Sequence, residues 1–502
     1  MNFFNSIENI LSSNSKRELI TTVDGSVYTR SDILEKTGRV TNFLYSLGAK
    51  PGDRISVQVH KSIENMCIYL ACLKGGLVFH PLNPSYKENE VEYFLGNAKP
   101  FVIICDPLNL DMMRKLSEPI DIKHIYTLDS YGNGQFSEAV KSCSSSFNTV
   151  SRNKDDLAAV LHSSGTTGLH KGIMLTHSNL VTNAECLVEY WGFSEKDRLL
   201  HVLPIFHVHG LFVALSCILL TGGTMRWADK FTPNYVNQYL PECTVMMGVP
   251  TYYTRLLSNA GFGKKHTQNI RLFTSGSAPL LVDTFNNFRD RSGFEILERY
   301  GMTETGMNCS NPLVGVRKPG TVGPALPGVT ARVVDDFGEI VNIGEVGDLQ
   351  VKGDNVFKGY WEMPEKTKED FTKDGFFNTG DQAIIDNDGY VSIVGRSKDM
   401  IISGGLNVYP KEVEDVIDML EGVKESAVFG VNHSDFGEAV VAAVVKVKSY
   451  ELDVNSVIEQ SKGKLANFKA PKYVELVKEL PRNTMGKVQK KQLRNKYKHL
   501  FD

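Results

Sequence analysis

Short apolar runs alternate with helical patterns from the start of the chain to about residue 310, and this alternation constrains the fold more than any other feature. The segments RISVQVH (54–60) and PFVIICD (100–106) have the length and the apolar content of short strands. Between them, SIENMCIYLACLKGG (62–76) has the spacing of an amphipathic helix and ends in glycine. Such alternation predicts an α/β fold in which helices cover a parallel sheet.

Two changes of pattern divide the chain, whose 502 residues exceed what one compact core usually holds. Short strand-like runs and turns from 320 to 395 predict a small antiparallel, β-barrel-like subdomain. After Arg396, two helical patterns and three strand-like runs predict a small α+β domain. We therefore predict a large N-terminal domain of βα-layered subdomains over 1–395, a hinge at 396–398 and a mobile C-terminal domain over 399–502.

Charge and composition exclude several classes of partner. A net charge of −3 gives no sign of binding to nucleic acid or to a membrane surface. The longest apolar stretch, Leu211 to Leu220, is about half of the ~20 residues that a membrane span needs. The eight cysteines show no Cys-x-x-Cys spacing and the first residues do not resemble a signal peptide, so we expect a cytoplasmic protein. The oligomeric state is not predicted.

A hydroxyl- and glycine-rich turn follows the strand-like run LAAVL and ends at Lys171. Glycines allow several backbone N–H groups to point at one oxyanion, and a lysine adds positive charge. The turn is not a Walker A loop, because Lys171 follows a histidine and Gly172 occupies the place of the magnesium-binding hydroxyl. A flexible linker is the alternative. The predicted phosphate site consists of Lys171 and of Ser163, Ser164, Gly165, Thr166, Thr167 and Gly168.

The segment from His162 to His177 resembles the signature loop of the adenylate-forming superfamily, which includes acyl- and aryl-CoA ligases, peptide-synthetase adenylation domains and luciferases. The usual form has tyrosine in place of His162 and often proline in place of His170. Other segments resemble the superfamily in the same order, namely SGSAPL (275–280), RYGMTET (299–305), GFFNTGD (375–381), GRSKDM (395–400) and PRNTMGK (481–487). The resemblance implies an enzyme that uses ATP, Mg²⁺ and coenzyme A and forms an acyl-adenylate.

The resemblance also implies which residues surround the nucleotide. Thr303 is expected to contact phosphate and Glu304 to bind magnesium. The role of Glu304 has a physical reason, because a carboxylate beside a triphosphate is repelled unless a cation bridges the two. Asp381 and Arg396 are expected around the ribose, whose hydroxyl groups suit a carboxylate acceptor. The other implied ATP-binding residues are Gly276, Ser277, Ala278, Arg299, Tyr300, Gly301 and Met302.

Four further positions match residues that the superfamily uses to alternate between two half-reactions. Lys398 falls on the hinge between the domains. Lys487 matches a lysine that enters the active site from the C-terminal domain, where an ammonium group neutralises the charge that develops during attack on the α-phosphate. Gly404 and Gly405 match the strip that the pantetheine arm of coenzyme A follows, since a thin ligand needs a close backbone approach.

The acyl substrate is suggested by the segments LPIFHVHGLFVAL (203–215) and VPTYYTRLL (249–257). His207 and His209 lie among apolar residues without an evident third ligand for zinc, which favours a core or pocket-lining role. Arg255 is either a helix-surface arginine or a clamp for a second carboxylate of the substrate. With GMNCSNP (306–312), these segments resemble malonyl-CoA synthetases, which implies malonate, and often methylmalonate, bound by His207, Arg255, Ser277 and Met307.

Three other functions stay open at this point. A CoA ligase for another short or aromatic acid and an adenylating enzyme that loads a carrier protein share the same motifs. An inactive nucleotide-binding scaffold is a different class, and the presence of both Lys171 and Lys487 argues against it.

Overall fold

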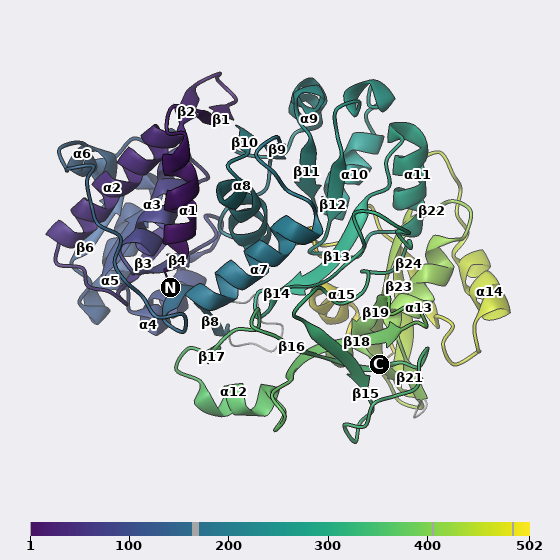
Figure 1. Cartoon of the computed structure of the whole chain (residues 1–502). Coiled ribbons are helices and arrows are strands. Elements are labelled where there is room, and N and C mark those ends of the chain that lie inside the picture. Colours follow the sequence, from purple (N-terminus) through teal and green to yellow (C-terminus); the bar gives the residue numbers. More distant parts are fainter. Residues whose placement is uncertain (1, 163–169, 404–405, 484–485, 502) are drawn as a thin grey trace. The chain divides into compact units, whose positions relative to one another are not determined.

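The computed structural model describes residues 2–162, 170–403, 406–483 and 486–501, and it divides into two compact units (Figure 1). The first unit comprises Met1–Pro319, Ala325–Thr330 and Lys352–Gly375. The second comprises Gly320–Pro324, Ala331–Val351 and Phe376–Asp502. The boundary predicted at 396–398 lies inside the second unit, and the hinge there stays a prediction.

Parallel strands form the centre of a seven-stranded sheet in the first unit, as the alternation of patterns predicted. β3 (Arg54–Gln58) pairs in parallel with β4 (Val78–Pro81) and with β5 (Val102–Cys105). The strand order is β17-β8-β7-β4-β3-β5-β6, and the pairs β7–β8 and β8–β17 are antiparallel. The other strands are β6 (His124–Thr127), β7 (Leu157–His162), β8 (Gly172–Thr176) and β17 (Gly359–Tyr360).

An eight-stranded sheet forms the rest of the first unit, in the order β14-β13-β12-β11-β9-β10-β1-β2. All of its neighbouring strands are parallel except the two edge pairs, β13–β14 and β1–β2. The carboxyl ends of the parallel strands therefore meet along one edge, where α/β proteins bind ligands. The strands are β1 (Glu18–Thr22), β2 (Val27–Thr29), β9 (Arg198–His201), β10 (Thr224–Trp227), β11 (Val245–Gly248), β12 (Leu272–Ser275), β13 (Leu297–Met302) and β14 (Gly306–Ser310).

Helices pack between and around these sheets (Figure 1). The predicted helix at 62–76 is α3 (Ile63–Lys74); the Ser62 hydroxyl caps its start by accepting from the Asn65 N–H, and it ends at Gly75. A π-helix, His209–Ala214, leads directly into α8 (Leu215–Thr221). The other helices of the unit are α1 (Phe3–Ser13), α2 (Arg30–Ser46), α4 (Glu88–Ala98), α5 (Leu110–Ser117), α6 (Gln135–Lys141), α7 (His177–Tyr190), α9 (Pro233–Tyr239), α10 (Pro250–Leu257), α11 (Val282–Ser292) and α12 (Pro364–Asp370).

The second unit begins with a four-stranded sheet in the order β15-β16-β18-β19, which occupies the predicted β-rich region. Its pairs β16–β18 and β18–β19 are antiparallel, as predicted. Within the described part of the chain, no helix is long and apolar enough to cross a membrane. The strands are β15 (Thr330–Val334), β16 (Gly347–Lys352), β18 (Phe377–Ile385) and β19 (Val391–Arg396).

The end of the chain has the predicted α+β composition. Side chains of its long strand β23 alternate between two cores, because successive residues of a strand point to opposite faces. Val440, Ala442 and Val444 pack with α13 and α14, whereas Val441, Ala443 and Val445 pack with α15. The elements are β20 (Ile401–Ser403), β21 (Leu406–Val408), β22 (Val423–His433), β23 (Gly437–Lys446), β24 (Tyr473–Leu476), α13 (Pro410–Asp418), α14 (Val454–Lys464) and α15 (Lys490–Tyr497).

Candidate active site

Part of the predicted site lies outside the described residues. This applies to the turn formed by Ser163, Ser164, Gly165, Thr166, Thr167 and Gly168, and to Gly404 and Gly405. Their roles stay predictions. Two clusters of polar side chains in the first unit, and one in the second, contain other predicted site residues.

The first group, called here the lysine cluster, consists of Lys171, Tyr360, Lys366 and Asp370. Antiparallel pairing of β17 with β8 places Tyr360 opposite Ile173 and therefore close to Lys171. The Lys171 Nζ lies 3.2 Å from Asp370 Oδ2 and 3.4 Å from the Tyr360 hydroxyl, and 4.4 Å from the centre of the Tyr360 ring. The Tyr360 hydroxyl donates to Asp370 at 3.0 Å. The lysine that we expect to bind phosphate is thus in contact with an acid.

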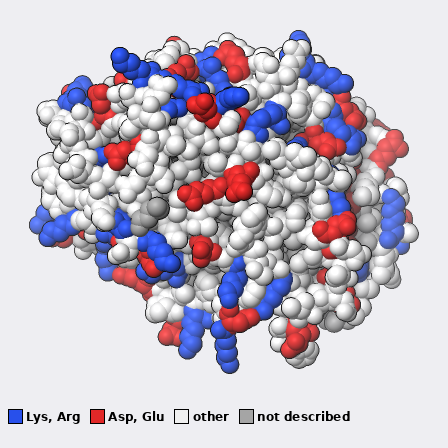
Figure 2. Space-filling model, viewed as in Figure 1, with Lys and Arg blue, Asp and Glu red and all other residues white. Residues whose placement is uncertain are grey.

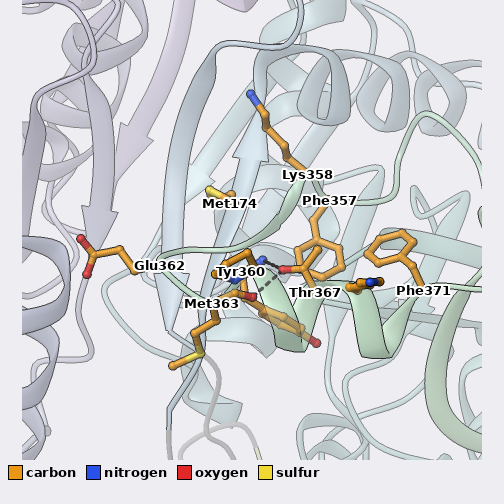
Figure 3. A pocket seen from close by; sticks show the side chains of 10 residues that line it. Met174, Phe357, Lys358, Tyr360, Glu362, Met363, Thr367 and Phe371 are labelled. Carbon is orange, nitrogen blue, oxygen red and sulfur yellow. Dashed lines mark hydrogen bonds between the residues drawn. The ribbon is translucent and has the colours of Figure 1, made fainter.

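Thr367 fixes helix α12 against β17 and so brings Asp370 to this position. Its hydroxyl oxygen accepts from the Tyr360 N–H at 2.9 Å and donates to the Met363 carbonyl at 2.9 Å, as Figure 3 shows. The same segment lines a cavity of about 590 Å³ with Met174, Phe357, Met363, Thr367 and Phe371 among its walls. The position of Asp370 is therefore determined by the strand pairing and by one threonine.

Glu304 lies in the turn from Thr303 to Thr305 that joins β13 to β14. Its carbonyl accepts from the Phe357 N–H at 2.7 Å, and the residue is buried. Burial raises the pKa of the Tyr360 phenol, and the negative charges of Glu304 and Asp370 raise it further. Glu304 is therefore close to the lysine cluster. A buried carboxylate near an expected phosphate lysine suits Mg²⁺, which commonly takes one or two carboxylates and completes its shell with phosphate and water.

The second group, called here the arginine cluster, consists of Arg299, His209 and Ser277. Arg299 belongs to β13, Ser277 follows the end of β12, and His209 begins the π-helix. Arg299 of β13 is only 3% exposed, and its Nε and Nη2 atoms have no hydrogen-bond partner among the described residues. A side chain at Gly276 would lie 2.4 Å from Arg299 Nη1, so the guanidinium group rests on bare backbone. Burial lowers the pKa of Arg299 to about 10, which leaves it positively charged at neutral pH.

His209 and Ser277 belong to the same cluster. The His209 Nδ1 lies 3.4 Å from the Ser277 hydroxyl, and its Nε2 is buried without a hydrogen-bond partner among the described residues. Burial, followed by the charge of Arg299, lowers the pKa of His209 far below its ordinary value, so the ring is neutral. Ser277 has φ +69°, a backbone conformation that few residues other than glycine adopt. A strained, polar and buried arrangement of this kind is typical of ligand sites.

The remaining predicted site residues of the first unit differ in their exposure and in their contacts. Met307 is buried against Gly301, where a side chain would lie 2.4 Å from the Met307 Cε. His207 accepts from the His209 N–H at 3.3 Å. Arg255 is exposed on α10, and its charge acts on Tyr252 of the same helix face. Ala278, Tyr300 and Met302 are half-buried, and Thr303 lines a small cavity with Asn183 and Asn355.

The second unit contains the predicted ribose residues in direct contact. Asp381 of β18 lies opposite Arg396 of β19, and the Arg396 Nε lies 2.7 Å from Asp381 Oδ1. Lys487 is exposed, and its backbone exchanges two 2.9 Å hydrogen bonds with Asn483. Burial lowers the pKa of Lys398 to about 8, and the positive charges of Arg396 and Lys487 contribute to this shift. The predicted hinge lysine, ribose residues and catalytic lysine are thus electrostatically connected within this unit.

We expect Lys398 to be unusually reactive near pH 8. About half of its side chains would be neutral amines there, whereas an ordinary lysine with a pKa of ~10.4 is almost fully protonated. Labelling with an amine-selective reagent between pH 7 and 9, followed by mass spectrometry, should show Lys398 reacting earlier than the exposed Lys491. Lys487→Met should raise the pKa of Lys398, because one nearby positive charge is lost. A labelling profile identical to that of Lys491 would contradict this prediction.

These features define a class of protein. An adenylate-forming enzyme combines two mostly parallel sheets in one unit with an α+β end. It also has a phosphate-binding lysine near a magnesium-binding carboxylate, the roles expected here of Lys171 and Glu304. A family model described as AMP-binding enzyme matches residues 11–361, and one described as AMP-binding enzyme C-terminal domain matches residues 412–487. The chain therefore belongs to the AMP-binding enzyme family.

Relatives of known activity agree with this assignment. The chain is 32% identical to a malonate–CoA ligase of Arabidopsis thaliana over 91% of its own length and 80% of the relative. It is 34% identical to a mitochondrial malonate–CoA ligase of Mus musculus over 89% of its length and 82% of that relative. Among solved structures, ATP-bound MatB from Rhodopseudomonas palustris is 47% identical, with a TM-score of 0.97 and complete coverage of both chains.

Sequence reasoning did not identify Asp370, Tyr360 or Lys366 as members of the lysine cluster. Its assignment of Arg299 to the nucleotide stays a prediction. The spacing of Lys366 and Asp370 on one helix face was the available signal for an ion pair. The sequence contained no signal that Lys171 joins them, because β17 has only two residues.

Proposed function

We propose that this protein ligates malonate, and with it methylmalonate, to coenzyme A through an acyl-adenylate. One substrate carboxylate attacks the α-phosphorus of ATP, the bond from that phosphorus to the pyrophosphate oxygen breaks, and pyrophosphate leaves. The thiol of coenzyme A then attacks the acyl carbonyl, and AMP leaves. The identity to malonate–CoA ligases over about nine-tenths of the chain supports this choice of acid.

The buried guanidinium group of Arg299 is the observation that carries the proposal. A buried charge without a partner costs free energy, and a second carboxylate on the substrate would supply the missing partner. Guanidinium binds carboxylate in a bidentate manner, and Nε together with Nη2 forms one of the two edges suited to it. Neutral His209 and the Ser277 hydroxyl offer polar contacts beside it. Arg255, predicted from the sequence for this role, is exposed and is the second candidate.

The other site residues take the roles implied by their motifs. Lys171 and Thr303 would bind the outer phosphates, and Asp381 with Arg396 would hold the ribose. Glu304 would hold Mg²⁺, which when bound neutralises phosphate charge. Lys487 would stabilise the charge that develops on the α-phosphate. A rotation of the C-terminal part about Lys398 would then withdraw Lys487 and bring Gly404 and Gly405 to the pantetheine arm.

Pyrophosphate–ATP exchange tests the proposal. We expect exchange to depend on added malonate and to be at least tenfold slower with butyrate or benzoate at equal concentration, because neither supplies a second carboxylate for the buried arginine. Equal exchange with butyrate would indicate a general short-chain acyl-CoA ligase. The absence of exchange with every acid would support a nucleotide-binding scaffold. To decide between the two acyl acceptors, thioester formation is measured with coenzyme A and, separately, with a pantetheinylated carrier protein.

We also propose a cytoplasmic location, although the mouse relative is mitochondrial by name. Fractionation of the source cells tests it.

A further inference from the structure

Asp370 has two lysine partners, and this double pairing suggests a function. Its Oδ2 lies 3.2 Å from Lys171 Nζ, and its Oδ1 lies 2.9 Å from Lys366 Nζ. Each oxygen of the carboxylate therefore has its own cation, and the Tyr360 hydroxyl also donates to it at 3.0 Å. The Asp370 side chain is only 18% exposed, so it needs a counter-charge in every state of the protein.

The two lysines differ in what they are expected to do. Lys171 is the expected phosphate lysine, and its ammonium group must leave Asp370 before it can pair with a phosphate oxygen. Lys366 is one helical turn from Asp370 on α12 and has no such second task. If Lys171 moves away, Lys366 and the Tyr360 hydroxyl still satisfy the carboxylate. The departure of Lys171 therefore does not leave a buried charge unpaired, and the exchange of partners costs little.

We propose that Asp370 is a positioning residue that releases Lys171 to ATP and takes it back from pyrophosphate, while Lys366 keeps Asp370 neutralised. The inference rests on the proposed function, because it takes Lys171 as the phosphate-binding lysine. Asp370 holds the Lys171 ammonium group beside the Tyr360 ring, from where it can pass to a phosphate oxygen. After the bond between the α-phosphorus and the pyrophosphate oxygen has broken, Asp370 competes with pyrophosphate for Lys171. This competition favours release of the product.

Asp370→Asn and Lys366→Met should have opposite effects on phosphate binding. Loss of the Asp370 charge removes the competitor, so we expect the Kd for magnesium pyrophosphate and for MgATP to fall about threefold to tenfold, the range of a partly buried ion pair. Loss of Lys366 leaves Asp370 with Lys171 as its only ammonium partner in this cluster, so both constants should rise by a similar factor. The KM for malonate should not change in either variant. A merely structural role would not produce this opposite pair of effects.

Calorimetric titration of the full chain with magnesium pyrophosphate, without any acid, is the test. Glu369→Gln is the matched control, since Glu369 is 68% exposed and contacts Lys366 but not Lys171. It should bind like the unaltered protein. Unchanged or weaker pyrophosphate binding in Asp370→Asn, with an unchanged melting temperature, would overturn the inference. Failure of the proposed function is separate, because it would appear as absent malonate-dependent exchange in the unaltered protein.

Discussion

Lys487→Met is expected to slow malonate-dependent pyrophosphate–ATP exchange by about 10²–10³-fold, the effect of removing a group that stabilises charge in the transition state. The ammonium group of Lys487 would approach the α-phosphate only during adenylation, so the second half-reaction should be spared. Transfer from preformed malonyl-adenylate to coenzyme A should therefore continue at more than a tenth of its original rate. Exchange measured with labelled pyrophosphate and thioester formation measured by chromatography separate the two steps.

The control for this variant is Lys491→Met, which removes an exposed lysine four positions further along the basic segment 487–498, a stretch rich in lysine and arginine. Its exchange rate should match that of the unaltered protein. If both variants lose activity equally, the segment acts through its overall positive charge. If Lys487→Met slows both half-reactions to the same extent, the alternation of the C-terminal part between two tasks is not supported.

Arg299→Met is expected to lower kcat/KM for malonate by about 100-fold, equivalent to roughly 3 kcal/mol for a buried charge pair that loses one partner. The loss should be much smaller for butyrate, so the preference between the two acids should narrow. Removal of a buried cation without a described partner should leave the melting temperature unchanged or raise it. Malonate should raise the melting temperature of the unaltered protein but have little effect on the variant.

Arg255→Met is the matched comparison, because methionine has a similar length and Arg255 lies on the exposed face of α10. We expect it to change kcat/KM for malonate by less than threefold. A loss confined to Arg255→Met would instead support the sequence-based assignment and give Arg299 a role in the fold. A fall in the melting temperature of Arg299→Met by several degrees, with malonate preference intact, would lead to the same conclusion.

The fold could be predicted from the sequence wherever local patterns were long. The helix at 62–76 and the strands around it were correct, because a serine cap and a terminal glycine mark the ends of the helix. Its predicted amphipathic character was wrong, since every residue of α3 except Glu64 is buried. The order of strands could not be predicted, since sheet pairing joins distant segments. β17 contains only Gly359 and Tyr360, yet it pairs with β8 and brings Tyr360 to Lys171.

The site could be predicted only where local motifs carry it, because contacts between distant segments leave no local pattern. Motifs predicted which residues surround the nucleotide, and the structure brings two of them, Asp381 and Arg396, into contact. Their role at the ribose stays a prediction. The surroundings of Arg299 were not predictable, because they depend on bare backbone at Gly276 and on the positive φ of Ser277 in a loop after another strand. The same limit applies to Asp370, whose contact with Lys171 spans 199 positions of sequence.

The π-helix that begins at His209 has a consequence for how the arginine cluster can diverge among related proteins. A π-helix bonds residues five apart, whereas an α-helix bonds residues four apart, so this turn holds one residue more than an α-helical turn would. The helix α8 that follows keeps Leu215, Cys217, Ile218 and Leu219 in the core. Gain or loss of one residue in the wide turn would therefore change which side chain faces Ser277 without repacking α8. Under the proposed function, a single insertion or deletion in this turn would alter the acid that the enzyme accepts, while the core residues of α8 keep their places.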